Sequence, residues 1–173
     1  MKIIKLILIC LPFGLFADIK IGYIDSNRIM AEFEDVRNVQ VELEKEQRKL
    51  QAEYDGMVNQ LDSLAQAFER QRLLMSDSRR EQQQNEMLQM ERDIQEFQLK
   101  KFGPEGEIYR KQNELLKPVL SKIDDAIQKV GGEQGYDFIL DAMSGALLYA
   151  LDSHNLTEDV MDELSKATGS VTE

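Results

Sequence analysis

The sequence contains no tryptophan and few aromatic residues, so it offers little bulk for a wide globular core. Aromatic residues make up only 7% of the 173 residues. Residues 34–129 consist mainly of Glu, Gln, Lys, Arg, Leu and Met, a composition that favours long helices. We therefore expect an elongated molecule.

Cysteine is almost absent, and the single Cys10 lies in an apolar N-terminal segment. Residues 1–17 carry two lysines, then an apolar run, then a small residue at Ala17. This order is typical of a secretory signal peptide cleaved after Ala17, which predicts export to an oxidising compartment. The alternative is an uncleaved anchor, but the run is short for a membrane span and Pro12 interrupts it. The mature chain would then contain no cysteine and no disulfide.

The chain also lacks the motifs of common enzymes. There is no Gly-rich phosphate loop, no G-x-S-x-G sequence and only one histidine, His154. A lone loop histidine is usually a polar surface residue. The acidic pairs Asp124-Asp125 and Glu158-Asp159 occupy adjacent helix positions, which do not face each other. We predict that the protein is not an enzyme and that it has no catalytic residue, metal site or cofactor.

Basic residues are fewer than acidic ones. Removal of the signal peptide would leave 19 basic and 32 acidic residues, a net charge of −13. Such a chain is repelled by nucleic acid and by anionic membranes, so we expect no nucleic-acid partner and no strong anionic membrane binding. Simple solubility is the alternative explanation for the excess acid.

The middle of the chain has the pattern of a helical hairpin. From Glu34, apolar residues recur at steps of three and four, as in a coiled coil, but Glu46 occupies one seam position. The pattern breaks at 75–78, where Ser76 or Ser78 can cap a second helix. Two antiparallel helices of about 40 residues would form an arm of about 60 Å. Residues 103–106, GPEG, predict a kink or short break.

Short apolar strands flank this arm. Residues 18–24 alternate with Ile19, Ile21 and Tyr23 on one face, and a short helix over 28–33 follows. After the arm, which should stop at Gly131-Gly132, residues 135–150 predict a β-hairpin with its turn at Gly145. The prediction is an α+β fold: a small β body of three strands per subunit and a long antiparallel helical hairpin. Three strands cannot bury both faces, so association is expected.

The order of these elements resembles the periplasmic chaperone family Skp, also called OmpH. The resemblance covers residues 18–166 and is most specific in KIGYIDSNRIM at 20–30, LLKPVLSKIDDAIQKV at 115–130, and GYDFILD with ALLYALDSHNLTEDV at 135–160. It implies a homotrimer shaped like a jellyfish, whose arms enclose unfolded outer-membrane proteins without an ATP cycle. The net charge departs from the basic members of the family, so no lipopolysaccharide site is carried over. Arg79-Arg80 is the only compact arginine pair.

Combined with this resemblance, the pattern divides the chain into a signal peptide (1–17), a β body for trimerisation (18–33 and 131–166), an arm (34–130) with its tip near 75–78, and a frayed tail (167–173). The residues predicted to form the core of the body and the trimer contact are Ile19, Ile21, Tyr23, Tyr136, Phe138, Leu140, Leu147 and Tyr149. The candidate client contacts are Met57, Phe68, Leu73, Leu74, Met75, Met87 and Met90.

The sequence supports two functional hypotheses. The first is a holdase chaperone for unfolded outer-membrane proteins, in which flexible methionines form an adaptable surface. The second is a structural or adaptor coiled coil of the cell envelope, for which the same methionines would be ordinary seam residues. A continuous, strong seam would favour the second hypothesis. The broken seam and the crowded apolar tip at 73–75 favour the first.

Overall fold

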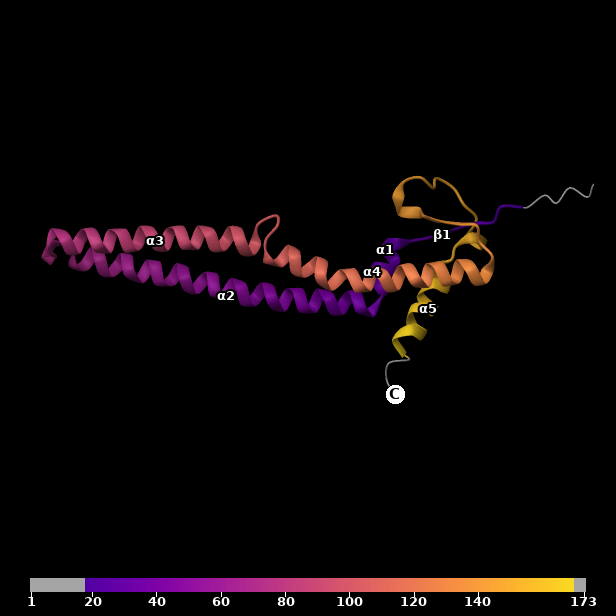
Figure 1. Cartoon of the computed structure of the whole chain (residues 1–173), viewed down its shortest axis with the longest axis horizontal. Helices are drawn as coiled ribbons and strands as arrows, with labels where there is room; N and C mark the ends of the chain where they lie inside the picture. Colours follow the sequence, from indigo (N-terminus) through magenta and orange to yellow (C-terminus); the bar gives the residue numbers. More distant parts are fainter. Residues whose placement is uncertain (1–17, 170–173) are drawn as a thin grey trace, which may run out of the picture.

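The computed structural model describes residues 18–169 and shows a long helical arm joined to a small body (Figure 1). The arm consists of α2 (Glu34–Gln71), the 3-10 turn η1 (Arg72–Leu74), α3 (Asp77–Phe102) and α4 (Glu107–Gln134). The predicted signal peptide and residues 170–173 lie outside the described residues.

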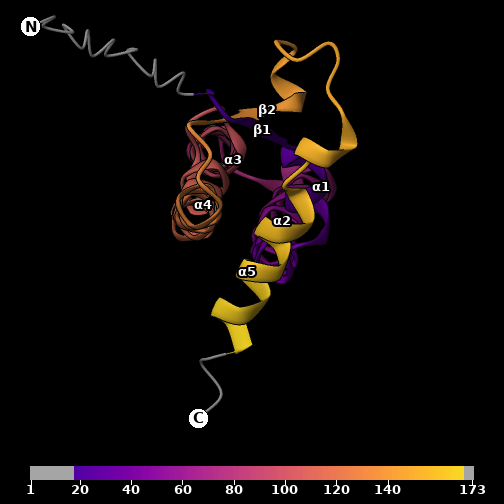
Figure 2. The same cartoon turned by 90° about the vertical axis from the view of Figure 1, so that its right-hand side faces the viewer.

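The body combines short elements from both ends of the described chain. They are β1 (Ile21–Ile24), α1 (Ser26–Glu32), β2 (Phe138–Asp141) and α5 (Thr157–Gly169), with the 3-10 turns η2 (Ala142–Ser144) and η3 (Asp152–His154). α5 packs against α4 and α1, and viewed along the arm it extends away from the two strands (Figure 2). α5 extends to Gly169, beyond Lys166, where the sequence predicts that the body ends.

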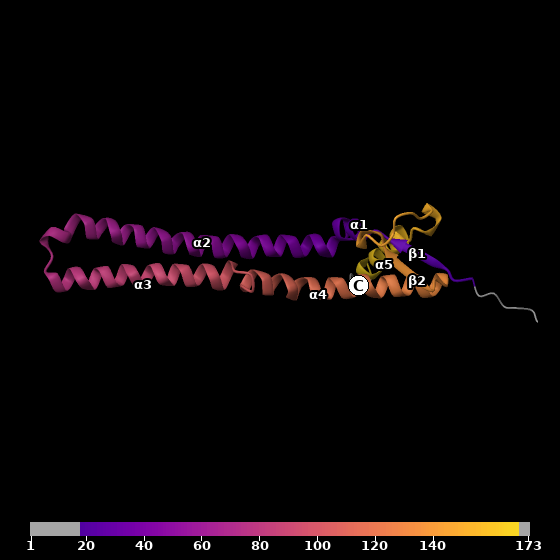
Figure 3. The same cartoon turned by 90° about the horizontal axis from the view of Figure 1, so that it is seen from above.

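The predicted helical hairpin is confirmed. α2 and α3 run antiparallel along the arm, and α4 continues α3 back to the body (Figure 3). Ser76 rather than Ser78 caps α3, with its hydroxyl accepting a hydrogen bond from the Arg79 N–H at 3.4 Å. Residues 103–106 break the return helix, whereas Pro118 lies within an unbroken α4.

The end of α4 differs from the sequence prediction. The helix continues past Gly131 and Gly132 to Gln134 and ends at Gly135, which has a left-handed φ of 69°. The Tyr136 N–H donates to the Gly131 carbonyl at 2.9 Å, as expected for a Schellman-type end. Gly131 serves packing instead, because an added Cβ would lie 3.0 Å from Ile139 Cδ1.

The predicted β-hairpin is wrong. β2 pairs with β1 in parallel, with Ile21 opposite Phe138 and Ile24 opposite Asp141, and these are the two strands of the described chain. Residues 146–151 form no strand and run as an irregular loop. The arm is the long crossover that parallel strands require. After β2 the chain enters η2, where the Asp141 carboxylate accepts from the Met143 N–H at 3.0 Å, instead of making a tight hairpin turn.

The core of the body lies between helices rather than on the predicted strand face. Its buried apolar side chains come from β1, α1, the body ends of α2 and α4, and α5; they include Ile24, Ile29, Phe33, Val36, Val39, Val119, Ile123, Val130, Leu156, Val160 and Leu164. On β1 the buried residues are Gly22 and Ile24, so the prediction that Ile19, Ile21 and Tyr23 form the core is wrong for the single chain. Gly22 decides this orientation, because an added Cβ would lie 2.7 Å from Leu156 Cδ1. Its lack of a side chain lets the chain pack tightly there.

Candidate functional site

The first candidate surface is the exposed face of the two-stranded sheet. Ile21 is 47% exposed and Phe138 is 58% exposed, although both lie on strands. A hollow of about 330 Å³ lies on this face, between the sheet and the loop that follows η2. Its lining comprises Ile19, Ile21, Gly22, Tyr23, Leu140, Leu147, Tyr149, Ala150 and His154. A contiguous apolar face of this kind is typical of a binding or association surface.

This hollow brings together six of the eight residues predicted for the body core and trimer contact. They are Ile19, Ile21, Tyr23, Leu140, Leu147 and Tyr149. Phe138 lies outside the hollow and is exposed. Tyr136 instead packs against the core and lies below Lys20, whose Nζ is 3.9 Å from the ring centre. The eight residues therefore do not form the core of one chain, because all but Tyr136 lie away from it.

Sequence reasoning missed the polar connection that fixes this sheet to α1. The Asp141 carboxylate accepts hydrogen bonds from the Ser26 hydroxyl at 2.7 Å and the Ser26 N–H at 3.4 Å. Burial raises the pKa of Asp141, but these bonds and the one from the Met143 N–H outweigh it and leave the pKa below its ordinary value of 3.8. The only signal in the sequence was a pair of separated cap residues, Ser26 and Asp141.

The second candidate surface is the arm, whose seam is thin. Beyond the body, the buried apolar side chains of α2 and α3 are Leu50, Phe68 and Ile94. Met57, Met87 and Met90 are half-buried in the seam. Phe68 is only 8% exposed, so the hairpin itself already covers this predicted client contact. A seam with so few buried residues gives the arm little stability of its own.

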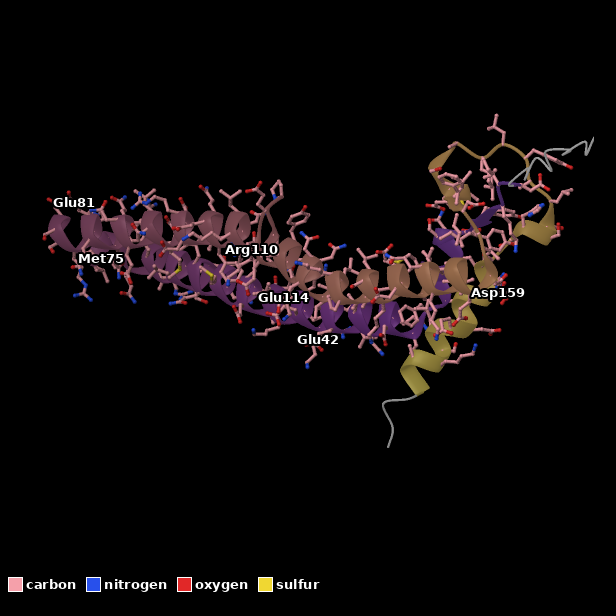
Figure 4. The ribbon with its side chains drawn as sticks, turned by 45° about the vertical axis from the view of Figure 1, so that its right-hand side comes forward. Glu42, Met75, Glu81, Arg110, Glu114 and Asp159 are labelled. Atoms are coloured by element: carbon pink, nitrogen blue, oxygen red, sulfur yellow. The ribbon has the colours of Figure 1, made fainter. Side chains whose placement is uncertain are left out.

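The tip of the arm exposes large apolar side chains. Leu73 is 87% exposed and Leu74 is 90% exposed, and both lie on the 3-10 turn η1. Met75 follows at half burial and lies at the far end of the arm (Figure 4). A turn of three residues cannot direct all of these side chains into one seam. The tip is therefore the most exposed apolar surface of the arm.

Charge is distributed unevenly between the arm and the body. Residues 63–112, the distal part of the arm, contain nine acidic and nine basic residues. Residues 131–165 contain eight acidic residues and no lysine or arginine. At the tip, Arg72 pairs with Glu69 at 3.1 Å and Arg80 with Asp77 at 3.4 Å. The excess negative charge thus belongs mainly to the body, and the distal arm is neutral.

Within residues 18–169, no group of histidine, cysteine and acidic side chains is arranged to hold a metal ion. His154 lines the apolar hollow from the 3-10 turn η3 and is exposed. No helix in the same range is long and apolar enough to cross a membrane. The two apolar surfaces described above are the candidates for function.

Comparisons with known proteins agree with this geometry. The family described as "Outer membrane protein (OmpH-like)" matches residues 20–164. The chain is 29% identical to the chaperone protein Skp of Yersinia enterocolitica over 145 residues, which cover 84% of this chain and 85% of the relative. It is 28% identical to the chaperone protein Skp of Photorhabdus luminescens, with the same coverage of both chains. A crystal structure of an OmpH-like outer membrane chaperone from Caulobacter crescentus shares the fold, with a TM-score of 0.76, 21% identity and coverage of 87% and 86% of the two chains.

Proposed function

Because the chain belongs to the OmpH-like family, we propose that it is a periplasmic chaperone that holds unfolded outer-membrane proteins without ATP. The observation that carries this proposal is the arm tip, where Leu73 and Leu74 are almost fully exposed at the end of a long hairpin whose distal part has no net charge. An exposed apolar tip is costly in water unless it binds something. Relatives at 25–29% identity are named as chaperones, which supports this assignment.

The proposed clients are unfolded chains of outer-membrane β-barrels. Their strands carry apolar residues at every second position, so each strand offers one apolar face. Leu73, Leu74 and the half-buried methionines of the arm would make many weak contacts with such chains. Weak contacts release a client without the need for nucleotide. Because the distal arm has no net charge, it does not repel clients of either sign over long range.

We further propose that the working protein is a homotrimer built through the exposed sheet face. A two-stranded sheet is marginal alone, and its face carries Ile21, Phe138 and Leu140 at 47%, 58% and 39% exposure. A second copy would remove this apolar area from water. Joined at the body, the arms would enclose a cavity for the client.

The thin arm seam disfavours the alternative of a structural spacer. A coiled coil that acts as a rigid spacer requires a continuous apolar seam. Here, Glu46 occupies one seam position and the return helix breaks at 103–106. These features are better suited to an adaptable arm.

The test is the aggregation of a porin diluted from urea, followed by light scattering. Mature protein at micromolar concentration, without nucleotide, should suppress the scattering. The double variant Leu73→Ser with Leu74→Ser should lose most of this effect. Leu88→Ser is the matched control, because Leu88 is 49% exposed but lies on α3, away from the tip. Scattering that is unchanged by the wild-type protein would refute the proposal.

A further inference from the structure

The return half of the arm contains a compact turn that separates α3 from α4. The Gly103 N–H donates to the Leu99 carbonyl at 3.0 Å, the Gly106 N–H donates to the Gly103 carbonyl at 2.8 Å, and helical bonding resumes from Arg110 to Gly106 at 3.1 Å. The loop stands out from the line of the helices (Figure 1). The hydrogen-bond ladder that stiffens a helix is therefore interrupted here.

The turn has a defined structure and is not a frayed helix end. An added Cβ at Gly103 would lie 2.3 Å from the Leu99 carbonyl oxygen, and one at Gly106 would lie 2.8 Å from the Lys101 carbonyl oxygen. Both glycines have ordinary extended dihedral angles, so space rather than strain excludes side chains. The backbone folds back closely on itself because these two positions carry no side chain.

One ion pair bridges this turn. Lys101, in the last turn of α3, donates a hydrogen bond to the carboxylate of Glu107, at the start of α4. Their side chains are 28% and 38% exposed, so the pair is partly shielded from water. The Lys101 ammonium also lies 5.8 Å from the centre of the Phe97 ring. Among residues 18–169, the bond from Lys101 to Glu107 is the one side-chain hydrogen bond between α3 and α4.

The opposite helix, α2, passes the turn without a break. Near this level it carries the charged pair Glu46 and Lys49, joined at 3.1 Å. The hydrogen bond from Lys101 is the main reason that the pKa of Glu107 lies below its ordinary value, and the positive charge of Lys49 lowers it further. Figure 3 shows α2 continuous beside the interruption of its partner. Bending at this level therefore deforms one helix instead of two.

We infer that residues 103–106 form a joint in the arm, and that the Lys101–Glu107 ion pair is the latch that holds it. With the latch closed, α3 and α4 keep a fixed angle. With it open, the distal arm moves as a unit about the continuous α2. Partly exposed ion pairs are weakened by salt, so the joint loosens as ionic strength rises. A role of the joint in adjusting the cavity to client size rests on the proposed function, but the joint itself does not.

Distances between spin labels on the two sides of the turn test this inference in the protein without client. Asn85 on α3 and Asn113 on α4 are exposed and span the turn, about 40 Å apart at helical rise. Both are replaced by cysteine in the mature chain, and labelled chains are diluted with unlabelled chains so that only distances within one chain are measured.

The latch variant is Glu107→Gln, and the matched control is Glu105→Gln in the same turn, where the exposed carboxylate makes no ion pair with a described residue. Glu107→Gln should widen the distance distribution, Glu105→Gln should leave it unchanged, and the charge swap Lys101→Glu with Glu107→Lys should restore the wild-type width. Raising the salt from about 0.1 M to about 1 M shortens the Debye length from about 10 Å to about 3 Å. It should widen the wild-type, Glu105→Gln and charge-swap distributions, which keep the ion pair, and leave that of Glu107→Gln unchanged.

Equal widths for Glu107→Gln and Glu105→Gln would overturn the inference, as would a wild-type distribution that salt does not change. Circular dichroism of each variant shows whether the helices are intact. Suppression of porin aggregation is measured separately. A fixed joint in an active chaperone refutes the latch alone, and a mobile joint in an inactive protein refutes the proposed function alone.

Discussion

The close packing at Gly22 predicts a large effect from a small substitution. A Cβ at this position would lie 2.7 Å from Leu156 Cδ1 and 2.9 Å from Tyr136 Cε1. Leu156 is 2% exposed, and the Lys20 ammonium covers the Tyr136 ring, so neither side chain has free space to move. Adding a methylene-sized group to a full core costs about 1–3 kcal/mol. Gly22→Ala should lower the free energy of unfolding by about that amount.

A double-mutant cycle shows whether the cost arises from this contact. Leu156→Ala alone should cost about 2–5 kcal/mol through the cavity that it leaves. The same cavity accommodates the new methyl group, so the double variant should be more stable than the sum of the two costs predicts, by about 1 kcal/mol. The coupling is partial because Tyr136 still lies within 3.0 Å of the added Cβ.

Urea unfolding at one fixed protein concentration measures these differences, because the stability of an oligomer depends on concentration. Gly132→Ala is the control, since a Cβ there meets nothing within 4 Å and α4 should gain about 0.5–1 kcal/mol. Strict additivity of Gly22→Ala and Leu156→Ala, or a Gly22→Ala protein as stable as wild type, would refute the packing argument.

Three further predictions concern assembly, pH and membranes. Phe138→Asp places a charge on the exposed sheet face and should dissociate the proposed trimer in analytical ultracentrifugation; a variant that remains trimeric means that this face is not the contact. The pKa of Asp141 is lowered in the fold, so its contribution to stability is present above about pH 4 and is lost as the pH falls through the lowered value. Asp141→Asn should flatten the loss of stability in acid, measured by urea unfolding at several pH values, and an unchanged slope contradicts this. Mature protein should bind anionic vesicles weakly at low salt, because the body is acidic and the distal arm neutral, and tight co-flotation contradicts that.

The sequence predicts the arm well because helical information is local and repeated. Apolar steps of three and four continue from Glu34 for many turns, and capping residues and the GPEG turn mark the interruptions. Each turn of a long helix adds to the same signal. The start of α2 and the break at 103–106 therefore agree with the structure.

The body is harder to predict because strand pairing depends on distant residues. Residues 146–151 have the composition of a strand, but the described chain provides no partner for them, and they remain a loop. On β1, the alternation of residues shows that two faces exist but not which one is buried. The lack of a side chain at Gly22 determines which face of β1 is buried. The reason appears only in the folded chain, where Leu156, from the far end of the sequence, packs over Gly22.

The contrast between local and distant information also applies to the candidate client contacts. Leu73 and Leu74 were predictable from crowding alone, because three successive apolar residues at a turn exceed what one seam can hold. In the sequence, Phe68 could be either a client contact or a seam residue. Only the position of α3 in the structure shows that Phe68 is covered. Burial of a single seam residue depends on the partner helix, which the local pattern does not define.

We propose that the arm tip holds the client and that the sheet face holds the other copies. Site-specific photocrosslinking tests both halves in one experiment, with the crosslinking residue at Leu74 or at Tyr149, which are 90% and 81% exposed. With a urea-unfolded porin present, the probe at Leu74 should attach to the porin, and the probe at Tyr149 should attach to a second copy of the chain. Porin attached at Tyr149 and absent at Leu74 would contradict this assignment of the two surfaces.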